Sequence, residues 1–376
     1  MRLALAGGGT GGHVVPGLHL LAHLCARGAA PSDVLWFCAG RPVEDAVLRS
    51  ARERLGNLAL DRVVLDIEPE KGGAPSWMRL AARTPVEASR AANALARHRS
   101  EVLLALGGFT ALPAVLAARS QGIPVVLLEV NAVPGKATRT LAGLAERVVH
   151  VFPVAKAPGT SSTARHATFG APLGPDFTAR ASGEEESARE RAHLGFDPGR
   201  PLLLVLGGSQ GAAPLNRFVR VHARELTAAG VQVLHQTGPG RLAEAAPFRD
   251  AGYRAVEYLD GMARVLDAAT LVLCRGGAST LAEIAARARP ALVVPYPHHR
   301  DRHQERNALA LGAGVRVVPE ERLGPELVTT VARLAGPDGR PERAAMERAL
   351  AAALPADGAP RLANELLKVA ARFRTT

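Results

Sequence analysis

The sequence predicts an α/β protein built from two similar halves, each with a parallel β-sheet and a glycine-rich loop. The first loop, Gly7-Gly-Gly-Thr-Gly-Gly12, follows the apolar segment 3–6, and the second, Gly207-Gly-Ser-Gln-Gly211, follows the apolar segment 202–206. A glycine turn between a strand and a helix lets backbone N–H groups at the helix N-terminus face an anion. Two copies indicate two nucleotide-binding-type domains with a cleft between them.

Short apolar segments alternate with helical patterns along both halves, which is typical of parallel βαβ units. We expect strands at residues 3–6, 34–38, 63–67, 102–106, 125–128, 202–206, 231–235, 255–258, 271–274 and 291–294. We expect helices at residues 14–27, 43–55, 79–99, 112–121, 135–145, 212–229, 261–268 and 279–287, with Pro85 as a break or start in the third. Residues 341–373 have the pattern of Ala/Arg-rich helices.

The composition near residue 172 marks the expected linker. Pro172, Gly174 and Pro175 lie close together, and the acidic run 184–186 follows. We therefore expect a first domain at residues 1–172 and a second at 173–355. The C-terminal helix, 356–376, is expected to pack back on the first domain.

Length and composition set further bounds. A chain of 376 residues is long enough for two separate cores, and 4% aromatic residues mean that Ala, Leu and Val must build them. The formal charge of +11 favours an anionic partner, although scattered arginines also fit a compositional bias. Three cysteines without Cys-x-x-Cys spacing fit a reducing cytosol. No signal peptide and no apolar run of about 18 residues is seen, so any membrane contact is expected at the surface.

The first glycine loop formally matches the dinucleotide fingerprint, but its context argues against NAD. The second expected strand ends in Cys38-Ala-Gly-Arg41 and lacks the acid that binds a ribose, which leaves a narrow NADP alternative. A P-loop motif is also absent. What remains is a glycine turn that carries His13 at a helix N-terminus, where the helix dipole favours a neutral imidazole able to accept a proton.

The segment from Cys274 to Ile284 indicates a second anion site. A strand meets Gly276-Gly277, and Ser279 and Thr280 open a helix with Glu283 one turn further on the same face. Backbone N–H groups and a hydroxyl there suit a diphosphate, and the carboxylate suits a ribose diol. The alternative is a capping box, with Ser279 or Thr280 as the N-cap and Glu283 at N3.

The segment 295–308 contains His299, Asp301 and His303 at a spacing compatible with a metal site. No second cluster of ligands completes it in the sequence, so we assign no metal.

Six motifs in order carry a resemblance to a known family. They are Gly8-Gly-Thr-Gly-Gly-His13, Gly107-Gly-Phe109, Glu129-x-Asn131, Gly207-Gly-Ser-Gln-Gly-Ala212, the 274–284 segment and Asp301-x-x-Gln304-x-x-Asn307-Ala. Jointly they resemble the MurG family, the undecaprenyl-diphospho-muramoylpentapeptide N-acetylglucosaminyltransferases, over most of the chain. The resemblance implies a GT-B fold, with two Rossmann-like domains flanking a deep cleft. It implies transfer of GlcNAc from UDP-GlcNAc to lipid I, giving lipid II for peptidoglycan, with inversion and without a required metal or other cofactor.

The resemblance also implies roles for individual residues of this chain. Carried over by motif, the donor sugar is contacted from the first domain by Thr10, Gly11, Gly12 and Asn131. Ser209, in the second glycine loop, contacts the diphosphate, and the backbone of Leu259 contacts the uracil. The phosphate and the ribose are held by Ala278, Ser279, Thr280, Leu281, Ala282 and Glu283. Gln304, with His303, is expected on the GlcNAc hydroxyls.

Two departures from the family pattern leave alternatives open. Leu128 stands where the family usually has His, and Gly170-Ala-Pro-Leu-Gly174 lacks the usual Asn and Arg. The alternatives are a related GT-B enzyme with another lipid or small-molecule acceptor, and a nucleotide-sugar-binding homologue with impaired catalysis. For the inverting transferase, His13 is the first candidate for the base and Glu129 the second.

The membrane-linked acceptor implies a peripheral protein on the cytoplasmic side of the inner membrane. The segment Trp77-Met-Arg-Leu-Ala-Ala-Arg83 mixes apolar and basic residues, as a surface that binds anionic phospholipid does. An ordinary amphipathic core helix is the alternative. No nucleic-acid partner is expected.

Overall fold

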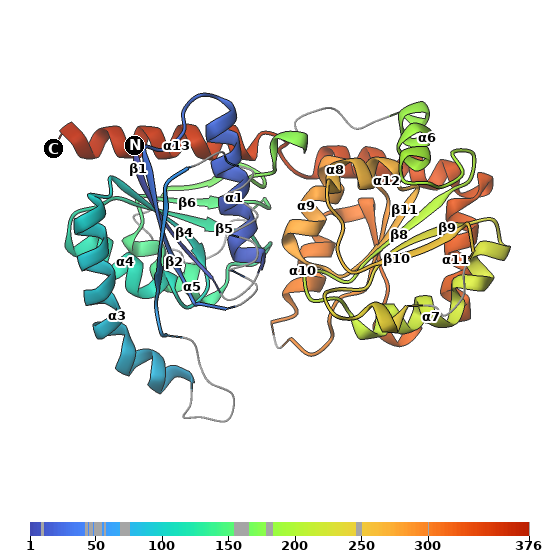
Figure 1. Ribbon diagram of the computed structural model, residues 1–376, viewed down its shortest axis with the longest axis horizontal. Helices are drawn as coiled ribbons and strands as arrows, with labels where there is room; N and C mark the ends of the chain where they lie inside the picture. Colours follow the sequence, from blue (N-terminus) through green and yellow to red (C-terminus); the bar gives the residue numbers. More distant parts are fainter. Residues whose placement is uncertain are drawn as a thin grey trace. The chain divides into compact units, whose positions relative to one another are not determined.

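The computed structural model describes residues 1–8, 11–41, 44, 48, 55, 58–67, 76–153, 165–177, 183–245, 250–299 and 301–375 (Figure 1). The chain divides into two compact units. Unit 1 comprises Met1–Pro175 and Pro355–Thr376, and unit 2 comprises Asp176–Leu354. The divisions fall three residues after the expected linker boundary at 172 and one residue before the expected start of the C-terminal helix at 356.

Unit 1 is a parallel sheet covered by helices on both faces. Its strands are β1 (Arg2–Gly7), β2 (Asp33–Cys38), β3 (Leu60–Val64), β4 (Val102–Gly107), β5 (Val125–Glu129), β6 (Arg147–His150) and β7 (Arg165–Thr168). Its described helices are α1 (Gly11–Ala26), α3 (Ser76–His98), α4 (Ala111–Ser120), α5 (Lys136–Leu141) and α13 (Gly358–Thr375), with a 3-10 turn at Ala142–Leu144. The strand order is β3-β2-β1-β4-β5-β6-β7, and every described pairing is parallel.

Unit 2 repeats this architecture with six strands in the order β10-β9-β8-β11-β12-β13, again all parallel. The strands are β8 (Leu202–Leu206), β9 (Gln232–Gln236), β10 (Tyr253–Val256), β11 (Leu271–Cys274), β12 (Ala291–Val293) and β13 (Val315–Val317). The helices are α6 (Glu184–His193), α7 (Ala213–Ala228), α8 (Met262–Ala268), α9 (Ala278–Ala286), α10 (His303–Leu309), α11 (Pro325–Ala335) and α12 (Arg340–Ala353). The predicted α/β class with two parallel sheets is therefore confirmed.

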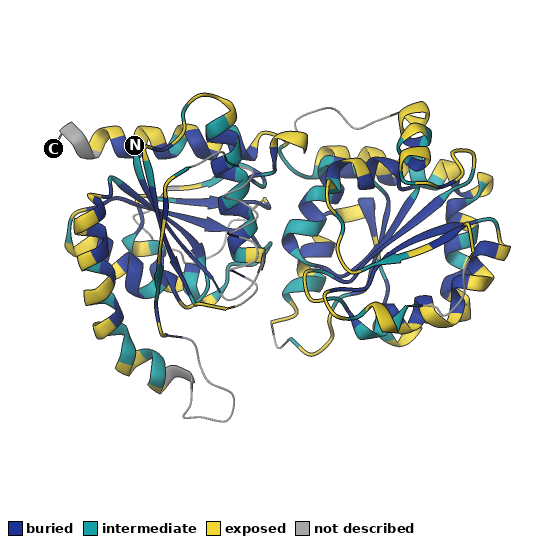
Figure 2. Ribbon diagram, viewed as in Figure 1, coloured by how far each residue is buried: buried dark blue, intermediate teal, exposed yellow. Residues whose placement is uncertain are grey.

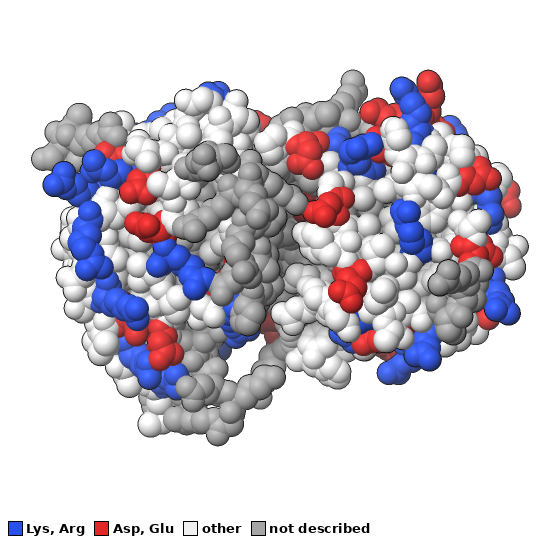
Figure 3. All heavy atoms as spheres, in the orientation of Figure 1, with Lys and Arg blue, Asp and Glu red and all other residues white. Residues whose placement is uncertain are grey.

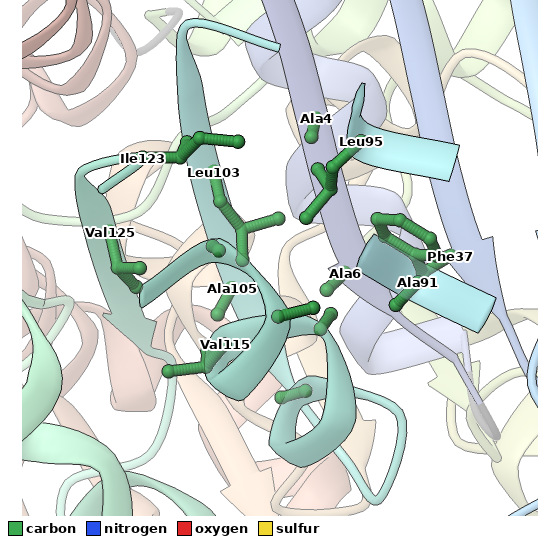
Figure 4. Packing of buried hydrophobic residues seen from close by; sticks show 14 of the residues in the cluster. Ala4, Ala6, Phe37, Ala91, Leu95, Leu103, Ala105, Val115, Ile123 and Val125 are labelled. Carbon is green, nitrogen blue, oxygen red and sulfur yellow. The ribbon is translucent and has the colours of Figure 1, made fainter. Parts of the chain in front are cut away.

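Small side chains let the helices of unit 1 lie close to its sheet. Alternate residues of a strand face opposite sides, so Ala4 and Ala6 of β1 pack toward α3 and α4 (Figure 4). On the other face, a Cβ added to Gly17 of α1 would lie 2.7 Å from the Trp36 ring. Both sheets are buried between their helices (Figure 2), so the expected Ala/Leu/Val cores are confirmed.

The C-terminal helix belongs to unit 1, where α13 packs against α1. The position at which the chain enters α13 is fixed where the backbone at Gly170 crosses the backbone at 355–358 in close contact. A Cβ on Gly170 would overlap the Pro355 carbonyl, and a Cβ on Gly358 would lie 2.5 Å from the Gly170 carbonyl oxygen. Gly170 also has φ +81°, a conformation that other residues rarely adopt.

Several expected elements differ from the structure. Strand β3 begins three residues earlier than expected and β10 two residues earlier, while β6, β7, β13, α6, α10 and α11 were not predicted. Helix α3 runs through Pro85 without ending, and the Thr84 hydroxyl donates a hydrogen bond to the Leu80 carbonyl at 2.6 Å beside it. The expected helix 43–55 lies mostly outside the described residues.

The three cysteines are free, and Cys38 and Cys274 are buried, as expected for small apolar side chains. Burial raises the pKa of the Cys274 thiol to about 12. Among the described residues, no helix is both long enough and apolar enough to cross a membrane.

Candidate functional site

The glycine loops lie at corresponding places in the two sheets. In each sheet the order of strands reverses beside the first strand of the unit, between β1 and β4 in unit 1 and between β8 and β11 in unit 2. Ligands of open α/β sheets bind at the carboxyl ends of the strands at this reversal. The loops after these four strands are the Gly7, Gly107, Gly207 and Gly276 turns, so the predicted motifs fall where this architecture binds ligands.

His13 lies in the first turn of α1, which begins at Gly11 rather than at the expected residue 14. The ring Nδ1 is 3.0 Å from the Gly8 carbonyl oxygen. A carbonyl only accepts, so Nδ1 carries the proton and Nε2 is the basic nitrogen of the neutral ring. The positive end of the helix disfavours the imidazolium form. This arrangement equips His13 to accept a proton.

The loop after β4 packs against the His13 ring. Gly107 and Gly108 have φ values of +98° and +79°. A Cβ on Gly107 would lie 3.4 Å from His13 Nε2, and one on Gly108 would lie 3.4 Å from Nδ1. The two glycines therefore let the backbone approach the imidazole closely and hold its orientation.

Glu129 ends β5 and is only 4% exposed. Its Oε1 accepts hydrogen bonds from the Asn131 backbone N–H at 2.9 Å and the Asn131 side-chain amide at 3.2 Å. Its Oε2 accepts from the Gly135 N–H at 2.9 Å and the Thr138 hydroxyl at 2.6 Å. The carboxylate thus ties the 130–135 loop to the start of α5, an arrangement that sets the position of Asn131.

The remaining candidates of unit 1 are consecutive residues at or just before the start of α1. Gly11 and Gly12 form the first turn of α1, where Gly12 is exposed, and Thr10 lies outside the described residues. Leu128 is buried in β5.

The loop after β8 places Ser209 on the surface of unit 2. Its conformation depends on close backbone packing: the Gly211 N–H donates to the Gly208 carbonyl at 3.0 Å, and a Cβ on Gly238 would lie 2.6 Å from the Gly211 nitrogen. Leu259 lies in the irregular segment between β10 and α8, half-buried.

Helix α9 begins at Ala278, with Gly277 as an N-cap that makes no side-chain capping bond. The capping-box alternative is therefore wrong, because Ser279 and Thr280 already lie inside the helix. Their side chains are half-buried, whereas Ala278, Leu281 and Ala282 are buried and anchor the helix. The first N–H groups of α9 thus have no side-chain cap from the N-cap residue, which suits an anion.

Glu283 is half-buried one turn into α9. Within the part of the chain that the structure describes, its carboxylate makes no side-chain hydrogen bond. Burial, and next the negative charge of Asp176, raise the pKa of Glu283 to about 8. A carboxyl group held in this way, with no structural partner, is characteristic of a functional position.

The Gln304 side chain, at the start of α10, accepts hydrogen bonds from two backbone segments. Its Oε1 accepts from the Gly276 N–H at 3.2 Å and the Tyr296 N–H at 2.9 Å, so the amide Nε2 points its donors elsewhere. The fully buried Asn307 adds a bond from its Nδ2 to the Gly276 carbonyl at 3.2 Å. The glycine turn before α9 is thereby fixed to α10.

His303 precedes Gln304 and lies against His299 and Asp301. Its Nδ1 is 2.9 Å from Asp301 Oδ1, and this hydrogen bond is the main cause that lowers the pKa of Asp301. Burial lowers the pKa of His299.

Sequence reasoning gave no role to Arg275. This buried side chain donates to the Val294 carbonyl at 3.0 Å and pairs with Glu320 at 2.5 Å, so it fixes the ends of β11 and β12. The sequence signal that could have indicated this role is an arginine directly after an apolar strand.

Comparisons with known proteins match this chain from end to end. The glycosyltransferase family 28 N-terminal domain model matches residues 3–150, and the C-terminal domain model matches residues 202–359. Two curated relatives named UDP-N-acetylglucosamine--N-acetylmuramyl-(pentapeptide) pyrophosphoryl-undecaprenol N-acetylglucosamine transferase are similar. The Nocardioides sp. protein is 39% identical over 98% of both chains, and the Sorangium cellulosum protein is 38% identical over 98% of this chain and 89% of its own.

Solved structures agree on the fold. The Acinetobacter baumannii MurG crystal structure superposes with a TM-score of 0.70 at 22% identity, over 98% of this chain and 99% of its own. The calicheamicin glycosyltransferase CalG4 gives a TM-score of 0.67 at 18% identity, over 99% and 98%. At such identities these two structures show the GT-B fold alone, whereas the curated relatives show the family. The chain belongs to glycosyltransferase family 28 and, within it, to the family of UDP-N-acetylglucosamine--N-acetylmuramyl-(pentapeptide) pyrophosphoryl-undecaprenol N-acetylglucosamine transferases.

Proposed function

We propose that this protein transfers GlcNAc from UDP-GlcNAc to lipid I, the undecaprenyl-diphospho-MurNAc-pentapeptide, and so makes lipid II. The similarity to the transferase relatives over nearly the whole chain carries this proposal. The acceptor hydroxyl attacks the anomeric carbon, a base removes its proton, and UDP leaves with inversion. No step in this scheme needs a cofactor.

Unit 2 is the proposed donor-binding unit. Strands β8 and β11 are paired, so the Ser209 loop and the N-terminus of α9 emerge side by side. Backbone N–H groups there stabilise the charge that develops on the leaving diphosphate. Ser279 and Thr280 hydroxyls add to this, Glu283 accepts hydrogen bonds from the ribose, and the Leu259 backbone meets the uracil.

Gln304 and His303 on unit 2 are the proposed contacts of the donor sugar. Gly11, Gly12 and Asn131, with Thr10, keep the donor-sugar role that the family resemblance implies. Gln304 contributes through Nε2, because its Oε1 is engaged by two backbone N–H groups. His13 is the proposed base. The four hydrogen bonds to Glu129 favour a positioning role for that carboxylate, which holds Asn131.

A lipid acceptor requires contact with a membrane, and we place that contact on α3. Met78 and Val86 are exposed at 48% and 68%. Arg90 and Arg97 are exposed on the same helix, while Arg79 pairs with Asp66 at 3.2 Å. Figure 3 shows basic side chains along the edge of unit 1 that α3 forms. An apolar and basic helix of this kind suits the anionic phospholipid of the cytoplasmic side of the inner membrane.

Turnover with defined acceptors tests the function. The purified protein should transfer labelled GlcNAc from UDP-GlcNAc to a lipid I analogue and give a product with inverted anomeric configuration by NMR. UDP release that requires a different lipid or small-molecule acceptor would support the related-transferase alternative, which the replacements Leu128 and Gly174 motivate. Binding of UDP-GlcNAc without turnover on any acceptor would indicate an impaired homologue.

Replacing His13 with alanine should lower kcat by about 10²–10⁴-fold, the usual effect of removing a general base. The affinity for UDP, measured by calorimetry, should stay near the wild-type value, because UDP is assigned to unit 2. Glu129→Gln is the comparison: it places an amide among four donors and should reduce both activity and the thermal stability of unit 1. Full activity in His13→Ala, or loss of turnover in a fully stable Glu129→Gln protein, would reverse the assignment.

The affinity for UDP should rise about tenfold between pH 7 and pH 9. The ionised Glu283 accepts the ribose hydrogen bonds, and its pKa of about 8 leaves it largely protonated at pH 7 and ionised at pH 9. Calorimetry should show that Glu283→Gln binds UDP more weakly at pH 9 and without this pH dependence. Glu326→Gln, an exposed acid in the first turn of α11, is the control and should behave like the wild type. An unchanged pH profile in Glu283→Gln would exclude the ribose role.

Binding to phosphatidylglycerol vesicles should depend on α3. Val86→Ser should weaken binding by about tenfold, because an exposed valine that enters the interface contributes roughly 1.5 kcal/mol. Val221→Ser removes an equally exposed valine from unit 2 and should have no effect. Co-sedimentation measures both, and equal binding of the two variants would argue against α3 as the contact surface.

A further inference from the structure

Three side chains with metal-binding atoms converge at the start of α10. His299 and Asp301 lie on the loop after β12, and His303 is the first residue of α10. The ligand atoms of all three lie within 4.8 Å of one another. Among the described residues, no other group of three or more His, Cys, Asp or Glu side chains meets in this way. Sequence spacing did not establish this, because no further ligand cluster was visible along the chain.

The separations match those between ligands of one metal ion. His299 Nδ1 is 3.1 Å from His303 Nδ1 and 3.3 Å from His303 Nε2. Two nitrogen ligands of a tetrahedral zinc ion, each at about 2.05 Å, lie roughly 3.4 Å apart. Asp301 Oδ1 is 2.9 Å from His303 Nδ1. The three atoms close enough to share one ion are therefore His299 Nδ1, Asp301 Oδ1 and His303 Nδ1.

The neighbouring side chains hold these rings in place. The His299 ring packs edge-on against Tyr296, with centroids 4.8 Å apart, and tilts against the His303 ring at 4.4 Å. Between the ligands, Arg302 adopts φ +47°, so that Asp301 and His303 turn to the same side.

The charge of the surroundings also permits a cation. Two arginines lie between the ligands in the sequence, and Arg300 is outside the described residues. The Arg302 guanidinium donates to Glu305 at 2.6 Å, and this pairing offsets the charge with which Arg302 would repel a metal ion. The donor set of two imidazoles and one carboxylate suits Zn²⁺ and related ions, whereas Mg²⁺ and Ca²⁺ prefer oxygen ligands alone.

We propose that His299, Asp301 and His303 form a binding site for a divalent transition metal of the zinc class, with water completing the coordination. The site shares His303 with the proposed donor-sugar contacts, but the chemistry proposed for sugar transfer uses no metal. It is tested on the full chain without substrates, so that its outcome does not depend on the proposed function.

Calorimetric titration of Zn²⁺ into the metal-free protein should show one saturable site that Mg²⁺ does not compete for. His299→Ala removes an imidazole ligand, and Asp301→Asn replaces the charged carboxylate ligand with a neutral amide. Each should weaken Zn²⁺ binding by at least tenfold. His298→Ala removes the exposed histidine next to the cluster and should bind Zn²⁺ like the wild type. Circular dichroism confirms that each variant is folded.

Cobalt gives an independent readout on the unaltered chain. Co²⁺ should produce visible absorption bands of a low-symmetry nitrogen–oxygen site, and Zn²⁺ should abolish them. The proposal is overturned if the wild type shows no saturable Zn²⁺ binding, or if the His299 and Asp301 variants bind Zn²⁺ as tightly as the wild type.

Discussion

The candidate site depends on close approach of backbone to backbone where the two sheets reverse their strand order. In unit 1 a Cβ on Gly7 would lie 2.7 Å from the Leu106 Cβ, and one on Gly108 would lie 3.0 Å from the Gly8 carbonyl oxygen. Real Cβ atoms essentially never come as close as 2.7 Å and rarely as close as 3.0 Å, and Gly108 also has φ +79°, so glycine favours the contact between the loops after β1 and β4. That contact holds the Gly8 carbonyl at the distance that fixes the tautomer of His13. The chemistry assigned to His13 therefore rests on a steric condition met by its neighbours.

Unit 2 meets the same condition with different partners. A Cβ on Gly207 would lie 2.5 Å from the Ala212 nitrogen, so the turn before α7 closes on itself. The turn before α9 instead packs against α10. There Gly276 contacts the backbone and the side chain of Gln304 and the side chain of Asn307. Both helix N-termini are thus presented by backbone packing. Their N–H groups can then face a diphosphate without movement of the loop, which is the preorganisation that electrostatic stabilisation requires.

Much of the fold could be predicted because the alternation of apolar strands and helices is strong in the centre of each sheet. The edges were harder. Strand β3 carries the exposed Asp61 and Arg62, so its hydrophobic signal shifts toward its end, and β13 has only three residues. Pro85 has a local signal for a break, yet α3 continues because its face packs on α4 and the sheet. Tertiary packing outweighs a single local preference.

In the candidate site, too, local features could be predicted from the sequence and long-range contacts could not. Glycine turns and the helix starts they precede are local, so the sequence indicates Gly207–Gly211 and Gly276–Gly277 directly. The hydrogen bond between the Gly276 N–H and Gln304 joins residues 28 positions apart in the sequence, and no local sequence pattern predicts such a bond. Nor does a local pattern show that Glu129 accepts four hydrogen bonds and therefore resembles a structural anchor more than a base.

Glu283 illustrates how structure separates two interpretations that sequence leaves equal. A capping box would satisfy its carboxylate within the helix, and the charged form would then be stabilised. Instead α9 starts at Ala278 with no side-chain cap, and burial and Asp176 destabilise the charge. The protein thus keeps a carboxyl group in a place where its ionised form is costly, and among the described residues no side-chain hydrogen bond compensates for that cost. A group of this kind gains most from a ligand that supplies hydrogen-bond donors, as a ribose diol does. The disfavoured charge on Glu283 therefore supports a role in binding the nucleotide and argues against a role in holding the helix together.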